Sequence, residues 1–174
     1  GNPRLLTETS RELLMSGLLD RKHLTPEALR ELKLPSTVSE IFSERIHQAL
    51  YKDKIGGEDW LRIHGEAHEV GLPSNATMLF GHIETDEEIV VHLMRLRELQ
   101  DRTGGFQSFI PLAYLPGETR LAPRAVSAPR SLRIIALSRL VLDNFPHVKA
   151  YWPTIGLETA AAALTSAEAW ASAL

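Results

Sequence analysis

Residues 60–116 decide the fold of this chain, and they read WLRIHGEAHEVGLPSNATMLFGHIETDEEIVVHLMRLRELQDRTGGFQSFIPLAYLP. Two apolar runs, at residues 74–81 and 106–114, have the length and composition of β-strands. A long amphipathic helical pattern at residues 86–102 lies between them. A strand, a helix and a strand in this order predict a βαβ unit with parallel strands. Polar residues follow each strand, at the edge of the sheet where α/β folds bind ligands.

Local signals mark where the elements of this unit begin and end. Thr85 is the expected N-cap of the central helix, and the acidic residues that follow it suit the helix dipole. Gly104 and Gly105 are expected to end this helix, and Gly71 to end the helix before the first strand. Individual residues therefore predict the boundaries of the βαβ unit.

The rest of the chain adds helices and a third strand. Further helices are expected at residues 8–18, 25–33, 39–51, 58–70, 129–144 and 158–174. The third strand is expected at residues 148–155. Strands separated by helices favour a parallel sheet, whereas a closed (β/α)₈ barrel has eight strands and about 250 residues. The 174 residues therefore predict an α/β fold that is either part of such a barrel or a small open sheet.

The composition excludes several classes of function. The chain is 44% hydrophobic and 24% charged, with a formal net charge of -3 and scattered basic residues, which argues against a nucleic-acid partner. No apolar run approaches the roughly 18 residues of a membrane span, and we expect a cytoplasmic protein without a membrane partner. The chain has no cysteine, so disulfides, thiolate metal sites and cysteine-ligated iron–sulfur clusters are excluded within it.

His64 and His68 lie four residues apart in one expected helix, with Glu66 between them. The spacing resembles a zinc-protease helix, but that motif places the glutamate directly after the first histidine. Gly65 occupies that position here, and no third ligand is indicated. We therefore interpret the two histidines as partly exposed residues of a helix face and predict no metal site.

His82 and Glu84 are candidates for a ligand site because they directly follow an apolar strand and Gly81. Glycine allows a ligand to approach the backbone closely. The alternative is that Glu84 and Thr85 only cap the following helix, and both roles are compatible.

Asn75 and Thr77 share one face of the first strand because side chains alternate along a strand. Two polar groups on one face favour a lined interior, with a hydrogen-bonded pair in the core as the alternative. Tyr151 and Trp152 form either an aromatic wall or part of the core.

Gln107 lies early in the second strand and, by alternation, shares a face with Phe109 and Pro111. A proline inside a strand disfavours a regular central ladder. It fits a bulged strand end, where a site can be re-aimed.

Four stretches between residues 41 and 155 carry a resemblance to a known family. They read IFSERIHQALY, EDWLRIHGEAHEVGLPSNATMLFGHIET, HLMRLRELQDRTGGFQSFIPLAY and SLRIIALSRLVLDNFPHVKAYW. They are similar to the C-terminal part of the radical SAM core of aminofutalosine synthases, from the futalosine route to menaquinone. Dehypoxanthine futalosine cyclases are close relatives, and the stretches look more like the synthases. The resemblance covers about two-thirds of the chain.

The resemblance implies a partial TIM-type (β/α) barrel whose N-terminal strands are missing. It also implies a reaction in which a 5′-deoxyadenosyl radical, made from S-adenosylmethionine at a [4Fe–4S] cluster, adds to an enolpyruvyl benzoate. In the family a CxxxCxxC loop holds the cluster, and this chain has no cysteine to replace it. The residues that the resemblance places near S-adenosylmethionine or the substrate are Asn75, Thr77, His82, Glu84, Gln107, Pro111 and Glu40.

Both ends of the chain are expected to depart from the family. Residues 1–38 form a helical segment, residues 39–156 are the part of the radical SAM core, and residues 157–174 form an alanine-rich helix. Before the first matching stretch only Glu40 remains of a glycine-rich family segment.

Two functions are compatible with these observations. In the first, the chain is a piece of an aminofutalosine synthase. It is then a fragment, or one part of a split enzyme that needs an N-terminal half as partner. Alternatively, it is a non-catalytic half-barrel that binds an adenosyl or aromatic carboxylate ligand. Without a cluster, we expect no radical chemistry from the chain alone.

Overall fold

The computed structural model describes residues 42–50, 54–117 and 124–171, with side chains described up to residue 165. Within this part the elements follow one another in the order α3 (Glu44–Leu50), α4 (Gly57–Glu69), β1 (Ser74–Phe80), α5 (Asp86–Thr103), β2 (Phe106–Ala113), α6 (Ala128–Val141), β3 (His147–Val148), α7 (Trp152–Ile155) and α8 (Leu157–Ala171). The helices expected at residues 8–18 and 25–33 lie outside the described residues, as does Glu40.

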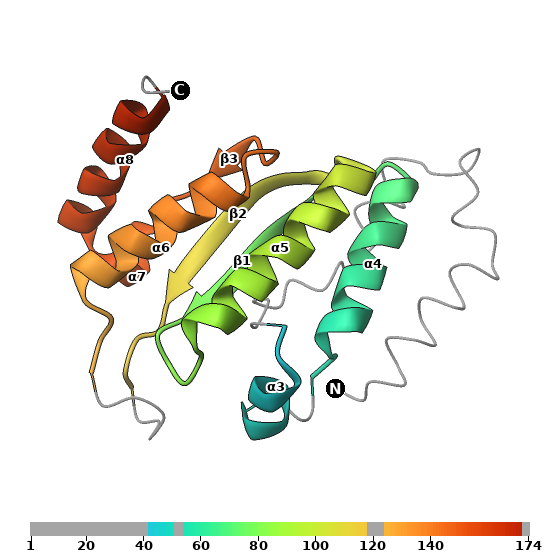
Figure 1. Cartoon of the computed structure of the whole chain (residues 1–174), viewed down its shortest axis with the longest axis horizontal. Helices are drawn as coiled ribbons and strands as arrows, with labels where there is room; N and C mark the ends of the chain where they lie inside the picture. The colour runs from blue at the N-terminus through green and yellow to red at the C-terminus, as the bar shows by residue number, and fades with distance from the viewer. Residues whose placement is uncertain (1–41, 51–53, 118–123, 172–174) are drawn as a thin grey trace.

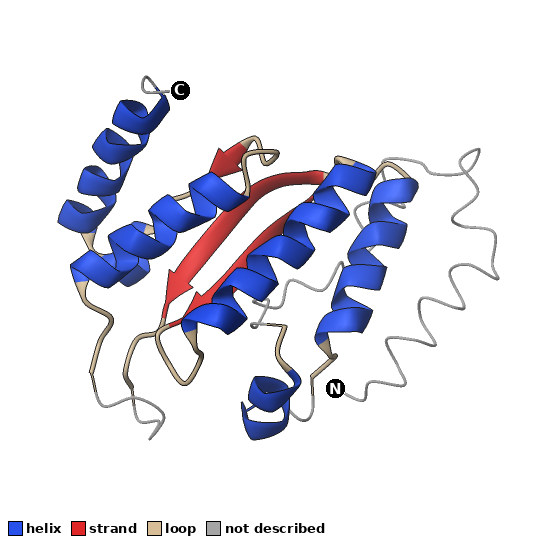
Figure 2. Cartoon of the chain, in the orientation of Figure 1, coloured by secondary structure: helices blue, strands red, loops and turns tan. Residues whose placement is uncertain are grey.

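The strands form one parallel sheet in the order β1-β2-β3. Helices α4, α5 and α6 lie side by side over one face of this sheet (Figure 1), and the strands are visible behind them (Figure 2). This confirms the α/β class and the βαβ unit at residues 74–113. The core lies between the helices and the sheet, and its largest fully buried side chains are Phe80, Phe106, Phe109, Phe145, Ile46, Met78, Ile89, Leu93, Leu96, Leu99, Ile134 and Leu142.

The third strand is much shorter than expected. Only His147–Val148 pairs with β2, and residues 152–155 form the short helix α7 instead of continuing the strand. Pro153 explains the difference, because it has no N–H to donate to a ladder and its ring suits the first turn of a helix. The expected strand at residues 148–155 was therefore wrong beyond Val148.

The bulge between β1 and β2 lies at the start of the strands and not near Pro111. Ser74 pairs with Phe106 and Asn75 with Ser108, so Gln107 is the extra residue and is exposed. Pro111 pairs in regular register with Met78. A proline is tolerated there because β3 ends before this position, so no N–H of residue 111 is needed for the ladder. On the β3 side, the carbonyl of Phe109 accepts from the N–H of Lys149, which follows β3.

Gln100 joins three elements at the buried start of β2. Its side-chain amide donates to the carbonyl of Phe106 (3.0 Å) and of Asn144 (3.3 Å), and its oxygen accepts from the N–H of Phe106 (2.8 Å). Both backbone groups of Phe106 therefore depend on one side chain from α5.

Replacing Gln100 with leucine should leave these buried backbone groups without partners. Each such group costs about 1–3 kcal/mol, so we expect the free energy of unfolding to fall by about 2–4 kcal/mol in urea denaturation. Gln48→Leu is the matched control, because Gln48 makes only an exposed contact with Glu44. Equal effects of the two substitutions would contradict this role of Gln100.

Candidate functional site at the end of β1

Residues 81–84 form a tight turn between β1 and α5. Gly81 has a φ of +95°, in the region that favours glycine. A Cβ at this position would lie 2.1 Å from Cγ2 of Val126, so space and backbone conformation both require glycine. Glycine is therefore required at position 81 because the segment before α6 passes close to it. We had expected the approach of a ligand to explain this glycine instead.

Glu84 holds this turn together from inside. Its two carboxylate oxygens accept from the backbone N–H of Gly81 (2.5 Å) and of His82 (2.9 Å), and its side chain is only 3% exposed. Burial raises the pKa of Glu84, but hydrogen bonds from the His82 ring and from nearby backbone N–H groups outweigh it and lower the pKa to about 2. Glu84 is therefore a buried, ionised carboxylate.

The side chain of His82 is fully buried, and its Nδ1 has two competing contacts. The N–H of Ile83 donates to Nδ1 (2.7 Å), and Oε2 of Glu84 lies 3.0 Å from the same nitrogen. If Nδ1 accepts, the proton of the neutral ring lies on Nε2. If Nδ1 donates to Glu84, Nε2 is an acceptor. Nε2 has no hydrogen-bond partner among the described residues, so this turn offers one donor or acceptor.

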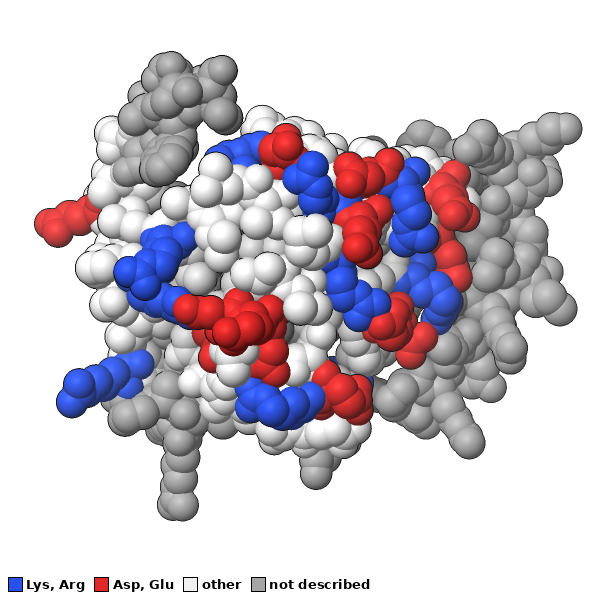
Figure 3. All heavy atoms as spheres, in the orientation of Figure 1, with Lys and Arg blue, Asp and Glu red and all other residues white. Residues whose placement is uncertain are grey.

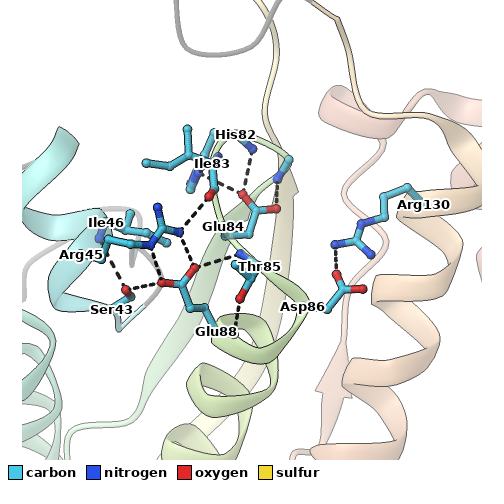
Figure 4. A network of polar contacts seen from close by, with 11 residues as sticks. Ser43, Arg45, Ile46, His82, Ile83, Glu84, Thr85, Asp86, Glu88 and Arg130 are labelled. Atoms are coloured by element: carbon cyan, nitrogen blue, oxygen red, sulfur yellow. Dashed lines mark hydrogen bonds and ion pairs between the residues drawn. The ribbon is translucent and has the colours of Figure 1, made fainter.

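The start of α5 is fixed by the expected cap. The Thr85 hydroxyl accepts from the N–H of Glu88 (3.2 Å), and the Glu88 carboxylate accepts from the N–H of Thr85 (2.9 Å), which is a complete capping box. Asp86 in the first turn pairs with Arg130 on α6 (Figure 4). The capping role predicted for Thr85 is confirmed. Glu84 instead accepts hydrogen bonds from the N–H groups of Gly81 and His82 in its own turn.

Sequence reasoning missed the side chains that reach this turn from before α4. Arg45 and Ser43 both contact the Glu88 carboxylate, and Arg45 also donates to the carbonyl of Ile83 (2.9 Å; Figure 4). The stretch IFSER was noticed only as part of a resemblance. No local pattern signals a contact across 38 residues.

The structure brings some of the predicted site residues together and separates others. Asn75 and Thr77 do share the face of β1 that α4 and α5 leave uncovered, where Asn75 accepts from Ser108 Oγ (2.5 Å). Their neighbours on that face are half-buried: Leu79, Ile110 and Leu112. His82 and Glu84 lie beyond the C-terminal end of the same strand.

Gln107 and Pro111 do not join this group. Gln107 lies in the bulge at the opposite end of the strands, and Pro111 is buried on the face covered by the helices. The expectation that Gln107 simply alternates with Phe109 was wrong because of the bulge. Tyr151 precedes α7 and Trp152 is its first residue, and they are 42% and 60% exposed, so neither belongs to the core of the described residues.

His64 and His68 are buried, which corrects their interpretation as partly exposed. They form one directed chain of hydrogen bonds. Thr103 Oγ1 donates to Leu99 O (2.9 Å), so it accepts from His68 Nδ1 (2.8 Å). Neutral His68 then accepts at Nε2 from the hydroxyl of Ser74 (2.7 Å), which in turn accepts from His64 Nδ1 (2.8 Å). Helix α4 packs on α5 and β1 through this chain.

Glu66 is separate from the two histidines and pairs with Arg62. Among residues 42–50, 54–117 and 124–171 there is no group of three side chains that could hold a metal ion. Since the whole chain has no cysteine, it also supplies no thiolate for a [4Fe–4S] cluster.

The outer surface carries charges of both signs. Figure 3 shows Arg, Asp and Glu side chains interleaved over α4 and α5. A groove of about 960 Å³ lies between these helices, with His68 and Thr103 among its lining residues. Two of its three arginines, Arg62 and Arg95, are paired with carboxylates, and the third is Arg102. In the described part of the chain no helix is long and apolar enough to cross a membrane.

Comparison with known proteins identifies relatives of the chain. Residues 103–174 match the family described as the CofH/MqnC C-terminal region. Aminodeoxyfutalosine synthase of Thermus thermophilus is 48% identical over 149 residues, which are 79% of this chain and 40% of that protein. The chain belongs to this family. The match to the CofH/MqnC region includes the residues of α8.

Two further relatives show how broad the family is. Aminodeoxyfutalosine synthase of Streptomyces coelicolor is 44% identical over 141 residues, 72% of this chain and 35% of that protein. A 5-amino-6-(D-ribitylamino)uracil–L-tyrosine 4-hydroxyphenyl transferase of Methanospirillum hungatei is 37% identical over 130 residues, 72% of this chain and 36% of that protein. The chain thus spans about two-fifths of the length of the curated relatives it matches.

Acid should destabilise the chain through its buried histidines. Burial, with a smaller contribution from the neighbouring His68 ring, lowers the pKa of His64 to about 4. Burial, with the charge on Arg95, lowers that of His92 to about 3. The unfolded chain therefore takes up protons first. We expect the free energy of unfolding to fall from about pH 6.5 to about pH 4, by up to about 1.4 kcal/mol per pH unit for each histidine.

Urea denaturation at several pH values measures this slope. His92→Phe should flatten it, whereas the core substitution Leu96→Ala should lower stability at every pH and keep the slope. An unchanged slope in His92→Phe would contradict the assignment. Glu84 and Glu88, whose pKa values are lowered to about 2, lose their contribution only as the pH falls below about 4.5.

Proposed function

We propose that this chain is a C-terminal part of the radical SAM core of an aminodeoxyfutalosine synthase. The observation that carries the proposal is the 48% identity to the Thermus thermophilus protein across 79% of the chain. Identity to the methanogen transferases is lower, 33–38%, which favours the synthase reaction over theirs. The three parallel strands with helices on one face are the arrangement that part of a (β/α) barrel would have.

The site proposed for the adenosyl or enolpyruvyl benzoate ligand lies on the uncovered face and at the C-terminal edge of β1. In (β/α) barrels the active site lies at the C-terminal edge of the strands, next to the side chains that point into the barrel. Thr77 would line the interior. Glu84 would fix the turn, and His82 would present Nε2, which has no partner among the described residues. We also propose a cytoplasmic location.

The [4Fe–4S] cluster of the family does not fit the residues of this chain, because none of them is a cysteine. Any cluster would have to be held by residues outside it. The reaction as a whole is therefore proposed only for an assembly that includes an N-terminal half.

The first experiment is to determine the coding sequence on both sides of this chain in its source DNA. A neighbouring or in-frame segment that encodes CxxxCxxC would supply the partner. The two parts, expressed together and supplied with S-adenosylmethionine and the enolpyruvyl benzoate, should then form aminodeoxyfutalosine. No product from a folded, cluster-loaded assembly would refute the proposal.

In that assembly His82→Ala should lower kcat/KM at least tenfold without unfolding the assembly, because it removes Nε2, the side-chain nitrogen that has no partner among the described residues. Steady-state kinetics and thermal denaturation together measure the two effects. Arg95→Ala is the control, since Arg95 pairs with Glu58 on the outer surface. Unchanged turnover in His82→Ala would remove this residue from the site.

The absence of cysteine favours a second candidate, a non-catalytic half-barrel that binds an adenosyl or aromatic carboxylate ligand. A ligand that binds only the folded chain raises its melting temperature. At 1,000 times the dissociation constant the gain is about 4 kcal/mol, which a thermal shift assay detects. A flat response to millimolar S-adenosylmethionine and to aminodeoxyfutalosine would count against this candidate.

A further inference from the structure

We propose that Arg45 is a positioning residue, which holds the turn at residues 81–84 in place through Glu88 and the carbonyl of Ile83. This inference rests on the proposed function, because it gives that turn a role in binding the ligand. Arg45 acts through His82 and Glu84 and touches no ligand itself.

Glu88 is the centre of the contacts. Its carboxylate accepts from Arg45 Nε (3.0 Å) and Nη2 (2.6 Å), from Ser43 Oγ (2.6 Å) and from the N–H of Thr85 (2.9 Å). Two of these partners precede or lie in α3, and one is the first residue after the turn. A single carboxylate on α5 therefore fixes α3 and the end of the turn relative to each other.

Arg45 adds a direct contact with the turn. The same Nη2 that binds Glu88 also donates to the carbonyl of Ile83 (2.9 Å). This contact fixes the peptide between Ile83 and Glu84, and thus the direction from which the Glu84 side chain returns to the N–H groups of Gly81 and His82. The planar, forked guanidinium can reach a carboxylate and a carbonyl at once, which a lysine ammonium on a single stem does less well.

Arg45 is expected to contribute little to the free energy of unfolding. The Arg45 side chain is 52% exposed, and exposed ion pairs contribute little to the free energy of unfolding because solvent screens them. One of its contacts nevertheless reaches the turn, at the carbonyl of Ile83, and the others hold Glu88, which accepts from Thr85 directly after the turn. An exposed residue with a small stabilising effect that contacts both the turn and Glu88 is better explained by the position of that turn.

A second, partly buried contact places α3 on the same face of α5. The N–H of Phe42 donates to Nδ1 of His92 (3.2 Å), which lies one helical turn after Glu88. Ile46 in α3 is fully buried in the core. Since α3 is anchored by Phe42 and Ile46 without Arg45, loss of the guanidinium should release the turn and leave α3 attached.

Amide hydrogen exchange followed by NMR on the full chain tests the proposal without a ligand. Arg45→Ala should speed exchange at the amides of Gly81, His82 and Thr85 at least tenfold, and leave the core amides of Met78 and Leu96 within twofold of the unmodified chain. The ¹⁵N resonances of the His82 ring should shift as well. Arg45→Lys, which keeps the charge, should restore part of the protection.

Arg95→Ala is the matched control, because it removes another ion pair between α5 and a second element, with Glu58, that does not contact the turn. It should leave the turn amides and the His82 resonances unchanged. Unchanged turn amides in Arg45→Ala would overturn the proposal. So would equal acceleration of the core amides, or failure of this variant to fold, since Arg45 would then act on overall stability. Because no ligand is present, failure of the proposed function would appear separately, as absent turnover.

Discussion

The buried carboxylate of Glu84 is the interaction on which the candidate site depends. A chain that leaves a strand and enters a helix within five residues has backbone N–H groups that need partners. Glu84 supplies them at Gly81 and His82, and its pKa is lowered to about 2 because those hydrogen bonds outweigh burial. The carboxylate thus fills the place that an anionic ligand would take. In the proposed site, the atom left for a ligand would be the buried Nε2 of His82, which has no partner among the described residues.

At the opposite end of the sheet, single side chains also satisfy more than one buried polar group. There the hydroxyl of Ser74 serves two histidines, and Gln100 serves both backbone groups of Phe106. These buried polar contacts replace apolar packing where helices α4 and α5 approach the strand starts. The hydrogen bond that Nε2 of His68 accepts from Ser74 requires a neutral imidazole, which links the packing of the helices to pH. Each end of β1 therefore holds a buried imidazole nitrogen without a hydrogen-bond partner among the described residues, Nε2 of His64 at one end and Nε2 of His82 at the other.

The sequence predicted the elements whose boundaries depend on adjacent residues. The capping box at Thr85 and the left-handed Gly104 placed α5 almost to the residue. The errors arose where distant contacts decide. Pro153 turned an expected strand into α7, a bulge moved Gln107, and packing buried His64. For the site, alternation correctly placed Asn75 and Thr77 on one face, but no pattern in the sequence connects Arg45 to a carbonyl 38 residues away.

The sheet face that the described helices leave uncovered supports the proposal of an assembly larger than this chain. Its side chains mix polar Asn75 and Thr77 with Leu79, Ile110 and Leu112, which are only half-buried among the described residues. A surface meant for water would be more uniformly polar, and a core face would be uniformly apolar. A mixed face on parallel strands suits the lined interior of a barrel, which is covered on both sides. Under the proposed function, an N-terminal half would complete that cover and also supply the cysteines that this chain lacks.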